Sequence, residues 1–377
     1  MSDECPITPE DQTHRQNARS KRGFPEYAVR PVRMAFGWLE HADPGTHRRI
    51  KGLRLVTAFG IAAMLGSLQQ IKHGLSNGSS LSSLAGGFAL WASVSEGRTN
   101  RADSSRDLLL LCAAAALGAA TMIGLTPLLS GPGRLGPELT LATGAFLVGY
   151  LKRFGILGAG IGSQIYIGQL LAYNARLIPA DLWMVAVAGL IAALAAIVPR
   201  VLSGPAERAV PGPAPLPVVV ARAVSPELAM GLQAAIAALV IVALNDTVGM
   251  EQSSWAITAC TYVIAGSAAG TIERVRRRII GTLIGVPLGI ACLPLATHAP
   301  LLLWVAAAVA MVIYAMALPE RYDIACAAFA FVLMVTLAVN GMHSTLVLSA
   351  RIWETMIGAT LGLAAAKLVF PLRLLSD

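Results

Sequence analysis

Charged residues are scarce in this chain of 377 residues: Asp, Glu, Lys and Arg make up 13% of it, against 55% hydrophobic residues. A soluble domain ordinarily carries about 25% charged residues. Apolar stretches approaching the roughly 20 residues that cross the hydrocarbon of a bilayer recur along the sequence. A single soluble core has no use for so many of them, so the composition predicts a polytopic α-helical membrane protein.

Several catalytic motifs are also missing. The chain has no Walker A loop, no H-E-x-x-H and no dinucleotide fingerprint. The loops between apolar runs are too short for a soluble catalytic domain. We therefore expect no enzymatic activity and no cofactor, and expect an ion gradient rather than ATP as any energy source.

Cysteine is used sparingly and without pairing. Cys5 lies in a polar N-terminal segment, and the other four lie inside apolar runs, at Cys112, Cys260, Cys292 and Cys326. No C-x-x-C pair occurs, so the sequence supports neither a metal site nor a disulfide framework. Buried cysteines acting as small hydrophobic side chains explain the pattern.

The basic residues carry topological information. The net charge is +8, but Lys and Arg lie almost entirely in short segments between apolar runs, which argues against a nucleic-acid surface. If successive segments between the spans lie on alternate sides of the membrane, one side holds only Lys72, Arg134 and Arg176. This bias predicts that both termini are cytoplasmic, and the long polar, basic start does not resemble a signal peptide.

Hydropathy predicts about twelve transmembrane helices. A Pro-rich linker at 200–225 separates two halves of six spans each, 52–199 and 226–370, with a basic tail at 1–51 and a C-terminal tail at 371–377. Within the tail, residues 24–40 are compatible either with an interfacial helix or with an unstructured basic segment. The predicted spans are 52–71, 81–95, 108–130, 138–151, 156–173, 182–199, 226–244, 252–270, 279–296, 300–318, 324–340 and 346–370.

The two halves resemble copies of one another. Five identical residues recur 171 positions apart: Gly60 and Gly231, Ser82 and Ser253, Ser83 and Ser254, Arg106 and Arg277, Gly118 and Gly289. Since each half has an even number of spans, the copies would form a parallel repeat.

Two stretches are candidates for functional helices. In the first, Arg278 precedes residues spaced for close helix packing on one face: Gly281, Thr282, Gly285 and Gly289. Packing and topology account for this pattern, although such a helix would also suit the border of a pathway. Pro287 within it predicts a kink.

The second stretch places charge inside the last span. Arg351 and Glu354 share a helical face with Trp353 between them, followed by Thr355 and Gly358. One interpretation is a structural ion pair near the interface. The other is a substrate site in which Arg351 attracts an anion, Trp353 offers an aromatic surface and Glu354 carries a proton. Gln164, close to the middle of its span, is the best further candidate for a solute contact.

These residues carry a family resemblance. The run from Trp255 to Thr258, the pattern Arg278-x-x-Gly281-Thr282-x-x-Gly285, and the later Arg351, Thr355, Gly358 and Pro371 resemble the fusaric acid resistance family, also called aromatic acid exporters. The resemblance covers about 226–372. It implies a bacterial inner-membrane efflux protein for aromatic carboxylates or similar weak acids.

The chain departs from that family in two respects. The cytoplasmic domain of its long members is absent, and Arg106 lacks the following Gly-Thr pair. A related architecture occurs in plant malate channels, where a dimer of six-span subunits forms an anion pore. By that analogy, the two halves would meet around one central pathway.

Three functions remain open from the sequence. The leading hypothesis is an exporter whose partners are a small anionic solute and the bilayer, with no nucleic acid and no metal. A passive anion channel and a non-transporting membrane scaffold are the alternatives. The sequence is also compatible with a homo-oligomer.

Overall fold

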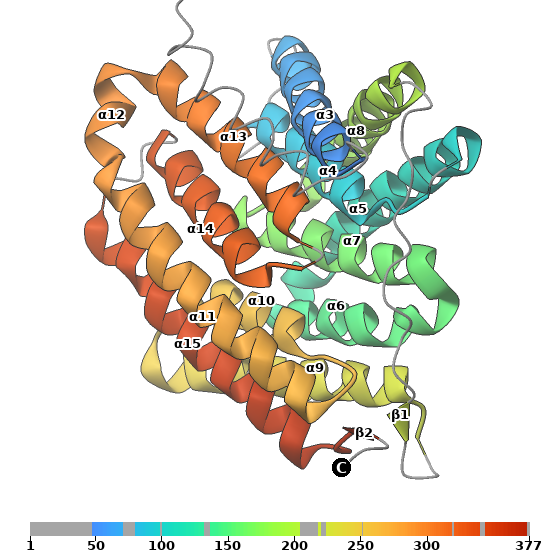
Figure 1. Ribbon diagram of the computed structural model, residues 1–377, viewed down its shortest axis with the longest axis vertical. Helices are drawn as coiled ribbons and strands as arrows, with labels where there is room; N and C mark the ends of the chain where they lie inside the picture. Colours follow the sequence, from blue (N-terminus) through green and yellow to red (C-terminus); the bar gives the residue numbers. More distant parts are fainter. Residues whose placement is uncertain are drawn as a thin grey trace, which may run out of the picture. The chain divides into compact units, whose positions relative to one another are not determined.

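The computed structural model describes residues 47–70, 80–98, 100–131, 136–203, 218–219, 224–250, 252–318, 320–339 and 344–374. Residues His47–Asp377 form one compact unit, which Figure 1 shows as a bundle of helices. Most of the predicted tail, including the proposed interfacial helix at 24–40, lies outside the described residues. The end of the predicted tail is helical, because the first helix already begins at His47.

Before the linker, the described residues form six α-helices and two short 3-10 helices. In chain order these are α3 (His47–Gln70), α4 (Leu81–Ser95), α5 (Arg101–Leu129), α6 (Leu139–Tyr150), η1 (Leu151–Phe154), α7 (Gly155–Asn174), η2 (Pro179–Asp181) and α8 (Leu182–Leu202). Polar side chains fix two of the starts: Ser80 caps α4 and Asn100 caps α5 by accepting backbone N–H bonds.

The described residues after the linker form seven α-helices. They are α9 (Pro226–Val248), α10 (Ser253–Val263), α11 (Ala268–Ala291), the short α12 (Leu293–His298), α13 (Pro300–Ala317), α14 (Tyr322–Val339) and α15 (Thr345–Leu368). Two short strands complete the described elements: β1 (Val218–Val219) pairs antiparallel with β2 (Arg373–Leu374).

The predicted span 252–270 is wrong in its second part. Helix α10 ends at Val263, and α11 begins at Ala268, so the arginines expected in a loop before position 279 lie on α11. Ser267 starts this helix by accepting the Gly270 N–H, and Glu273 pairs with Arg277 one turn further on. The cap and the i,i+4 ion pair favour a helix where hydropathy alone indicated a polar loop.

Length and hydropathy identify a multi-pass membrane protein. Among the described residues, six stretches are long and apolar enough to cross a membrane: His47–Leu68, Arg101–Leu129, Leu139–Asn174, Pro179–Leu202, Pro226–Val248 and Pro300–Ala317. The third stretch is not one straight helix, since η1 divides it into α6 and α7. With 12 residues, α6 rises only about 18 Å, less than the roughly 30 Å of hydrocarbon.

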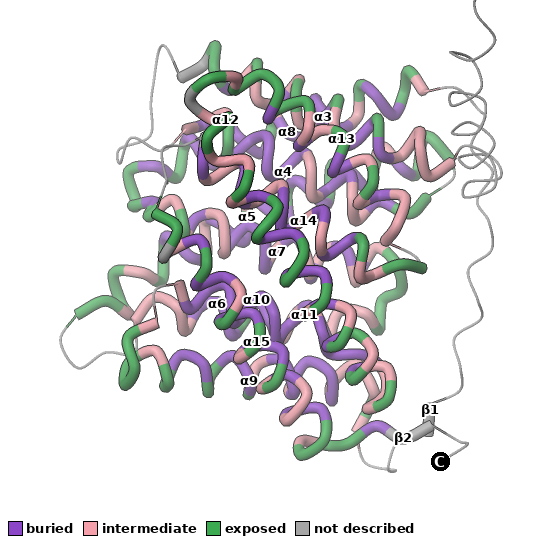
Figure 2. Tube along the Cα trace, turned by 60° about the vertical axis from the view of Figure 1, so that its left-hand side comes forward, coloured by how far each residue is buried: buried purple, intermediate pink, exposed green. Residues whose placement is uncertain are grey.

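Small side chains fill the interior and large apolar ones face outward. Alanine is the commonest residue of the largest core cluster, whereas Leu117, Leu190, Leu194, Leu301 and Leu302 are all more than half exposed. Figure 2 shows buried and exposed stretches alternating along the helices. This distribution suits a lipid-facing exterior, because between membrane helices close packing, rather than hydrophobic burial, provides the attraction.

Helix packing follows the same pattern in both parts of the chain. Before the linker, α5 packs against α7 and α8, and α6 packs against α7. After the linker, α11 packs against α14 and α15, and α13 packs against α14. The two parts touch through α6 against α9 and through α13 against α3.

Candidate functional site

A large cavity lies between the two parts of the chain. Its volume is about 1570 Å³, and its walls come mainly from α4 and α7 on one side and from α10, α11 and α14 on the other. At one end it reaches Pro137, Arg176 and Ile178; at the other it reaches Glu273 and Glu320. We call the second end the basic end, because α11 supplies Arg274, Arg277 and Arg278 there.

Helix α10 presents three side chains to this cavity from one face. Trp255, Thr258 and Tyr262 are spaced three and four residues apart, which aligns them on one face of a helix. Nearly all of α10 is buried, although the helix has only 11 residues. A short, buried helix of this kind is fixed by its surroundings and holds its side chains in defined positions.

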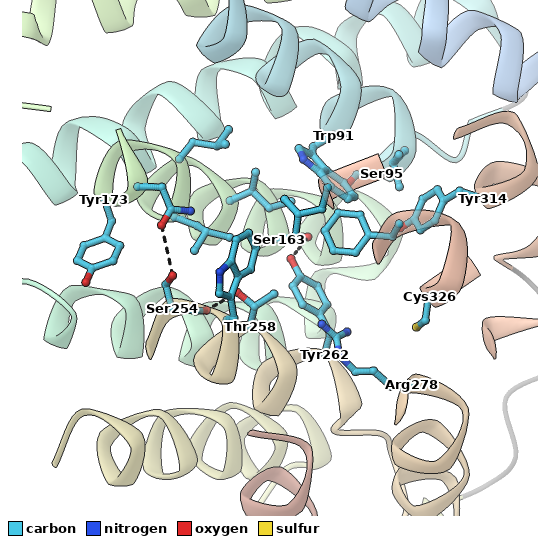
Figure 3. A pocket seen from close by; sticks show the side chains of 18 of the residues that line it. Trp91, Ser95, Ser163, Tyr173, Ser254, Thr258, Tyr262, Arg278, Tyr314 and Cys326 are labelled. Carbon is cyan, nitrogen blue, oxygen red and sulfur yellow. Dashed lines mark hydrogen bonds between the residues drawn. The ribbon is translucent and has the colours of Figure 1, made fainter. Parts of the chain in front are cut away.

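Hydrogen bonds join the facing walls, as Figure 3 shows for two of them. The hydroxyl groups of Ser163 on α7 and Tyr262 on α10 are 2.7 Å apart. One turn along, the Tyr166 and Thr258 hydroxyl groups are 2.8 Å apart, and the Ser254 hydroxyl donates to Asn174 Oδ1 at 3.3 Å. These bonds fix α7 against α10 along the length of the cavity.

Three aromatic side chains form a cluster on the cavity wall. The ring centroids of Trp91 and Phe329 are 5.4 Å apart with the planes at 71°, and those of Trp91 and Tyr314 are 6.1 Å apart with the planes at 88°. The cluster joins α4 of the first half to α13 and α14 of the second. Such edge-to-face contacts are the favoured geometry for aromatic pairs, so the cluster forms a rigid apolar surface.

Most of the charged side chains at the basic end form ion pairs with one another. Arg277 Nε donates to Glu273 Oε1 at 2.6 Å, and Arg276 also pairs with Glu273. Arg48, on α3, pairs with Glu320, between α13 and α14. Hydrogen bonds from these arginines lower the pKa of both carboxyl groups below the ordinary value of 4.5.

Arg278 differs from these neighbours because it is buried, with 7% of its surface exposed. Its Nη1 donates to the Tyr322 hydroxyl at 3.2 Å, and its Nε has no hydrogen-bond partner among the described residues. It lines the cavity below Tyr262, with Cys326 nearby (Figure 3). The sequence had suggested Arg278 as the start of a packing motif and not as a lining residue.

Arg351 lies directly behind the cavity wall. It is 3% exposed, and its guanidinium carbon lies 3.8 Å from the centroid of the Trp255 ring and 5.6 Å from that of Phe329. Both aromatic residues line the cavity. Among the described residues, Arg351 Nε and Nη1 have no hydrogen-bond partner. The side chain is therefore held by a cation–π contact rather than by exposure at the interface.

The remaining predicted site residues do not share one surface. Glu354 is fully buried and accepts the backbone N–H of Gln252 at 2.7 Å. Gln164 is also buried and donates to the Ser95 hydroxyl at 3.0 Å. Trp353 is 39% exposed and does not line the cavity.

Three of the four predicted residues thus contact the cavity wall from behind. Gln252 and Ser95, which bind Glu354 and Gln164, both line the cavity, as does Trp255, against which Arg351 lies. The side chains that face the space were not singled out from the sequence: Trp91, Tyr262, Tyr314 and Phe329. The spacing of Trp255, Thr258 and Tyr262 was the available signal, because it places all three on one helical face.

The glycine motif lies at close helix contacts. A Cβ atom added at Gly281 or Gly285 would overlap the carbonyl oxygens of Asp323 or Ala327 on α14, and one at Gly289 would overlap Met334. On α15, a Cβ at Gly358 would overlap the carbonyl oxygen of Ala256 on α10. Thr282 and Thr355 are buried beside them. The motif therefore brings α11 and α15 close to the helices that form the cavity.

The described residues contain no group of three or more His, Cys, Asp or Glu side chains that could hold a metal ion. The wall instead combines aromatic rings, hydroxyl groups and guanidinium groups. These groups can accommodate a mostly apolar molecule that carries a negative charge.

Residues 234–365 match the model of the family described as fusaric acid resistance protein-like. This match includes the resembling residues Trp255, Arg278 and Arg351, and it confirms the family resemblance over this part of the chain. No curated protein and no solved structure matches the chain.

Proposed function

From this similarity to fusaric acid resistance proteins we propose that the chain moves a small amphipathic anion across the membrane through the cavity between its two halves. One observation carries the proposal: a single space of about 1570 Å³ extends from Arg176 to Glu273 and Glu320. In the topology that we propose, these residues lie near opposite membrane surfaces. A bundle built only for packing would have no need of such a space, since protein interiors are close-packed.

The proposed architecture is a parallel repeat of two six-helix halves. Equivalent packing supports it, because α5 with α7 and α8 corresponds to α11 with α14 and α15. The two contacts between halves also correspond, since α3 and α6 of the first half match α9 and α13 of the second. The cavity would then lie on the approximate two-fold axis. Under the positive-inside rule the basic end faces the cytoplasm, together with both termini.

The solute class that we propose is an aromatic carboxylate or a similar weak acid, exported across a bacterial inner membrane at the expense of an ion gradient. The aromatic cluster and the excess of arginines in the wall support an apolar anion. We propose transport rather than catalysis. The cavity is formed within one chain, so the proposal requires neither a second copy nor a cofactor.

A passive anion channel is the second candidate. Among the described residues, the acidic side chains in the cavity wall are Glu273 and Glu320, and both are paired with arginines at the basic end. Glu354 lies behind the wall rather than in it. A pathway without a carboxylate at mid-membrane has no obvious proton carrier, which favours movement down the solute's own gradient.

Uptake of labelled aromatic acids into proteoliposomes tests the proposal. We expect uptake of benzoate that exceeds the leak of protein-free vesicles. An imposed pH gradient should accelerate an ion-coupled exporter, whereas a membrane potential alone should suffice for a channel. If no member of a panel of aromatic and aliphatic carboxylates moves faster than in empty vesicles, the proposed function is wrong.

A pair of bulky substitutions ties this activity to the cavity. Ala159 lines the cavity on α7, so Ala159→Trp should obstruct it and reduce transport strongly. Leu190 on α8 is 64% exposed, and Leu190→Trp at this outward position should leave the rate close to that of the original protein. Equal rates for both variants, with folding preserved, would show that the solute does not pass through this space.

A further inference from the structure

We infer that Arg278, together with the aromatic side chains of Trp91, Tyr314 and Phe329, forms the solute-binding subsite of the cavity. In this arrangement the guanidinium group of Arg278 binds the carboxylate, and the apolar body of the solute lies against the aromatic cluster. The inference rests on the proposed transport function and assigns residues to it.

The first argument is the uncompensated charge of Arg278. Arginine remains protonated in proteins, and a buried charge is costly unless it is paired. Arg278 is more than nine-tenths buried, yet its hydrogen-bond partner among the described residues is the neutral hydroxyl group of Tyr322. Its Nε donor is unused within the described residues. A carboxylate in the cavity would supply the missing negative charge and accept a hydrogen bond from Arg278 Nε.

The second argument is that the neighbouring cations are already engaged. Arg277 binds Glu273 and also donates to the Glu320 carbonyl oxygen at 2.7 Å. Arg274 donates to the Ile264 carbonyl oxygen at 3.2 Å. Arg351 is separated from the cavity by the Trp255 ring on which it rests. Among these four arginines, Arg278 is the one that combines burial, a place in the wall and an unused donor.

The third argument is the position of the aromatic cluster. Arg278 and Tyr314 line the same cavity, and Tyr314 belongs to the cluster with Trp91 and Phe329. Figure 3 shows Tyr262 between Arg278 and the part of the cavity where Trp91 and Ser95 lie. A solute with its anionic end at Arg278 can therefore extend its apolar end toward these rings.

This chemistry predicts the class of solute. One available guanidinium group matches one carboxylate, and two parallel N–H bonds to it give both strength and orientation. A second negative charge on the solute would lie against aromatic and aliphatic side chains without a partner, which is unfavourable. The subsite should therefore prefer apolar monocarboxylates to dicarboxylates and to uncharged amides of the same shape.

Binding to the purified full-length protein in detergent tests this assignment. The probes are benzoate, its neutral analogue benzamide and the dianion phthalate, measured by calorimetry. We expect benzoate to bind and the other two to bind at least about tenfold more weakly. Arg278→Gln should weaken benzoate binding by roughly tenfold or more, because it removes a charge-assisted interaction. Arg276→Gln, on the same helix but outside the cavity wall, is the matched control and should change binding little.

Trp91→Leu provides a second route if Arg278→Gln does not fold. This variant should weaken benzoate more than it weakens hexanoate, because only benzoate loses a ring contact. If the original protein binds and transports benzoate but Arg278→Gln or Trp91→Leu behaves like it, the subsite is wrong and the proposed function stands. If the original protein neither binds nor transports any probe, the proposed function itself fails.

Discussion

Alanine substitutions at glycines provide a direct test of the helix packing. In an exposed helix position, Gly→Ala stabilises the helix by about 0.5–1 kcal/mol, because glycine loses more backbone freedom on folding. At a closely packed position the added Cβ must instead displace a neighbour, and such overpacking costs about 1–3 kcal/mol. The same substitution is therefore expected to have opposite signs at different positions of this bundle.

The structure assigns those signs. Gly60 on α3 and Gly124 on α5 have nothing within 4 Å of an added Cβ. At Gly118 on α5 the Cβ would overlap the backbone of Ile165, and at Gly285 on α11 it would overlap the backbone of Ala327. A backbone carbonyl cannot rotate away as a flexible side chain can. We expect the exposed and the packed variants to differ in unfolding free energy by about 2–4 kcal/mol.

Unfolding by sodium dodecyl sulfate from mixed micelles, followed by circular dichroism, measures this difference. Gly60→Ala and Gly124→Ala should match or exceed the stability of the original protein, while Gly118→Ala and Gly285→Ala should both fall below it. A loss of similar size for the last two would also support the equivalence of the α5–α7 and α11–α14 contacts. If Gly285→Ala were as stable as Gly60→Ala, the close approach of α11 to α14 would be wrong.

Two further predictions concern charge. Arginine hydrogen bonds lower the pKa of Glu320 and Glu273. These ion pairs therefore stabilise the fold at pH values above the ordinary carboxyl pKa of 4.5, and the stabilisation is lost only as the pH falls through the lowered pKa. Between about pH 6 and 8, Glu320→Gln should therefore change the transport rate by the same factor at every pH. A pH profile that differs in shape from that of the original protein would contradict this. For the contact of Arg351 with Trp255, a double-mutant cycle of Arg351→Met and Trp255→Leu should give a coupling of about 1–2 kcal/mol in the same unfolding assay. Additive effects would show that the ring does not hold the charge.

Much of the fold could be predicted from hydropathy and capping residues. The start of α4 at Leu81 and that of α9 at Pro226 agree with the expected spans, because a serine precedes each and an apolar run follows. The start of α11 was missed by eleven residues, at Ala268 rather than 279. Hydropathy treats arginines as loop residues, whereas here they extend a helix beyond its apolar part, and three of them line the cavity.

The site was less predictable, because charge within a span does not reveal which face is wet. The spacing of Arg351 and Glu354 is compatible with an ion pair or with a solute site, and it does not reveal that Glu354 binds the Gln252 N–H or that Arg351 rests on Trp255, which is distant in sequence. Trp353 lies between them in sequence but is 39% exposed and does not line the cavity. Similarly, Gly60 and Gly231 match in the sequence repeat, but only Gly231 meets a neighbouring helix, at Phe146.

The paired contacts of α6 with α9 and of α13 with α3 bear on how such a molecule could have arisen. The first helix of each half packs against a helix from the middle of the other half: α3 packs against α13, and α9 packs against α6. Each half therefore uses the same two positions to contact the other. That is the geometry of an isologous dimer. A six-helix ancestor could have enclosed the same space with a second copy of itself. Joining two such copies in one gene would then have allowed each side of the passage to change independently, with an aromatic cluster and a buried arginine that need not recur on both sides.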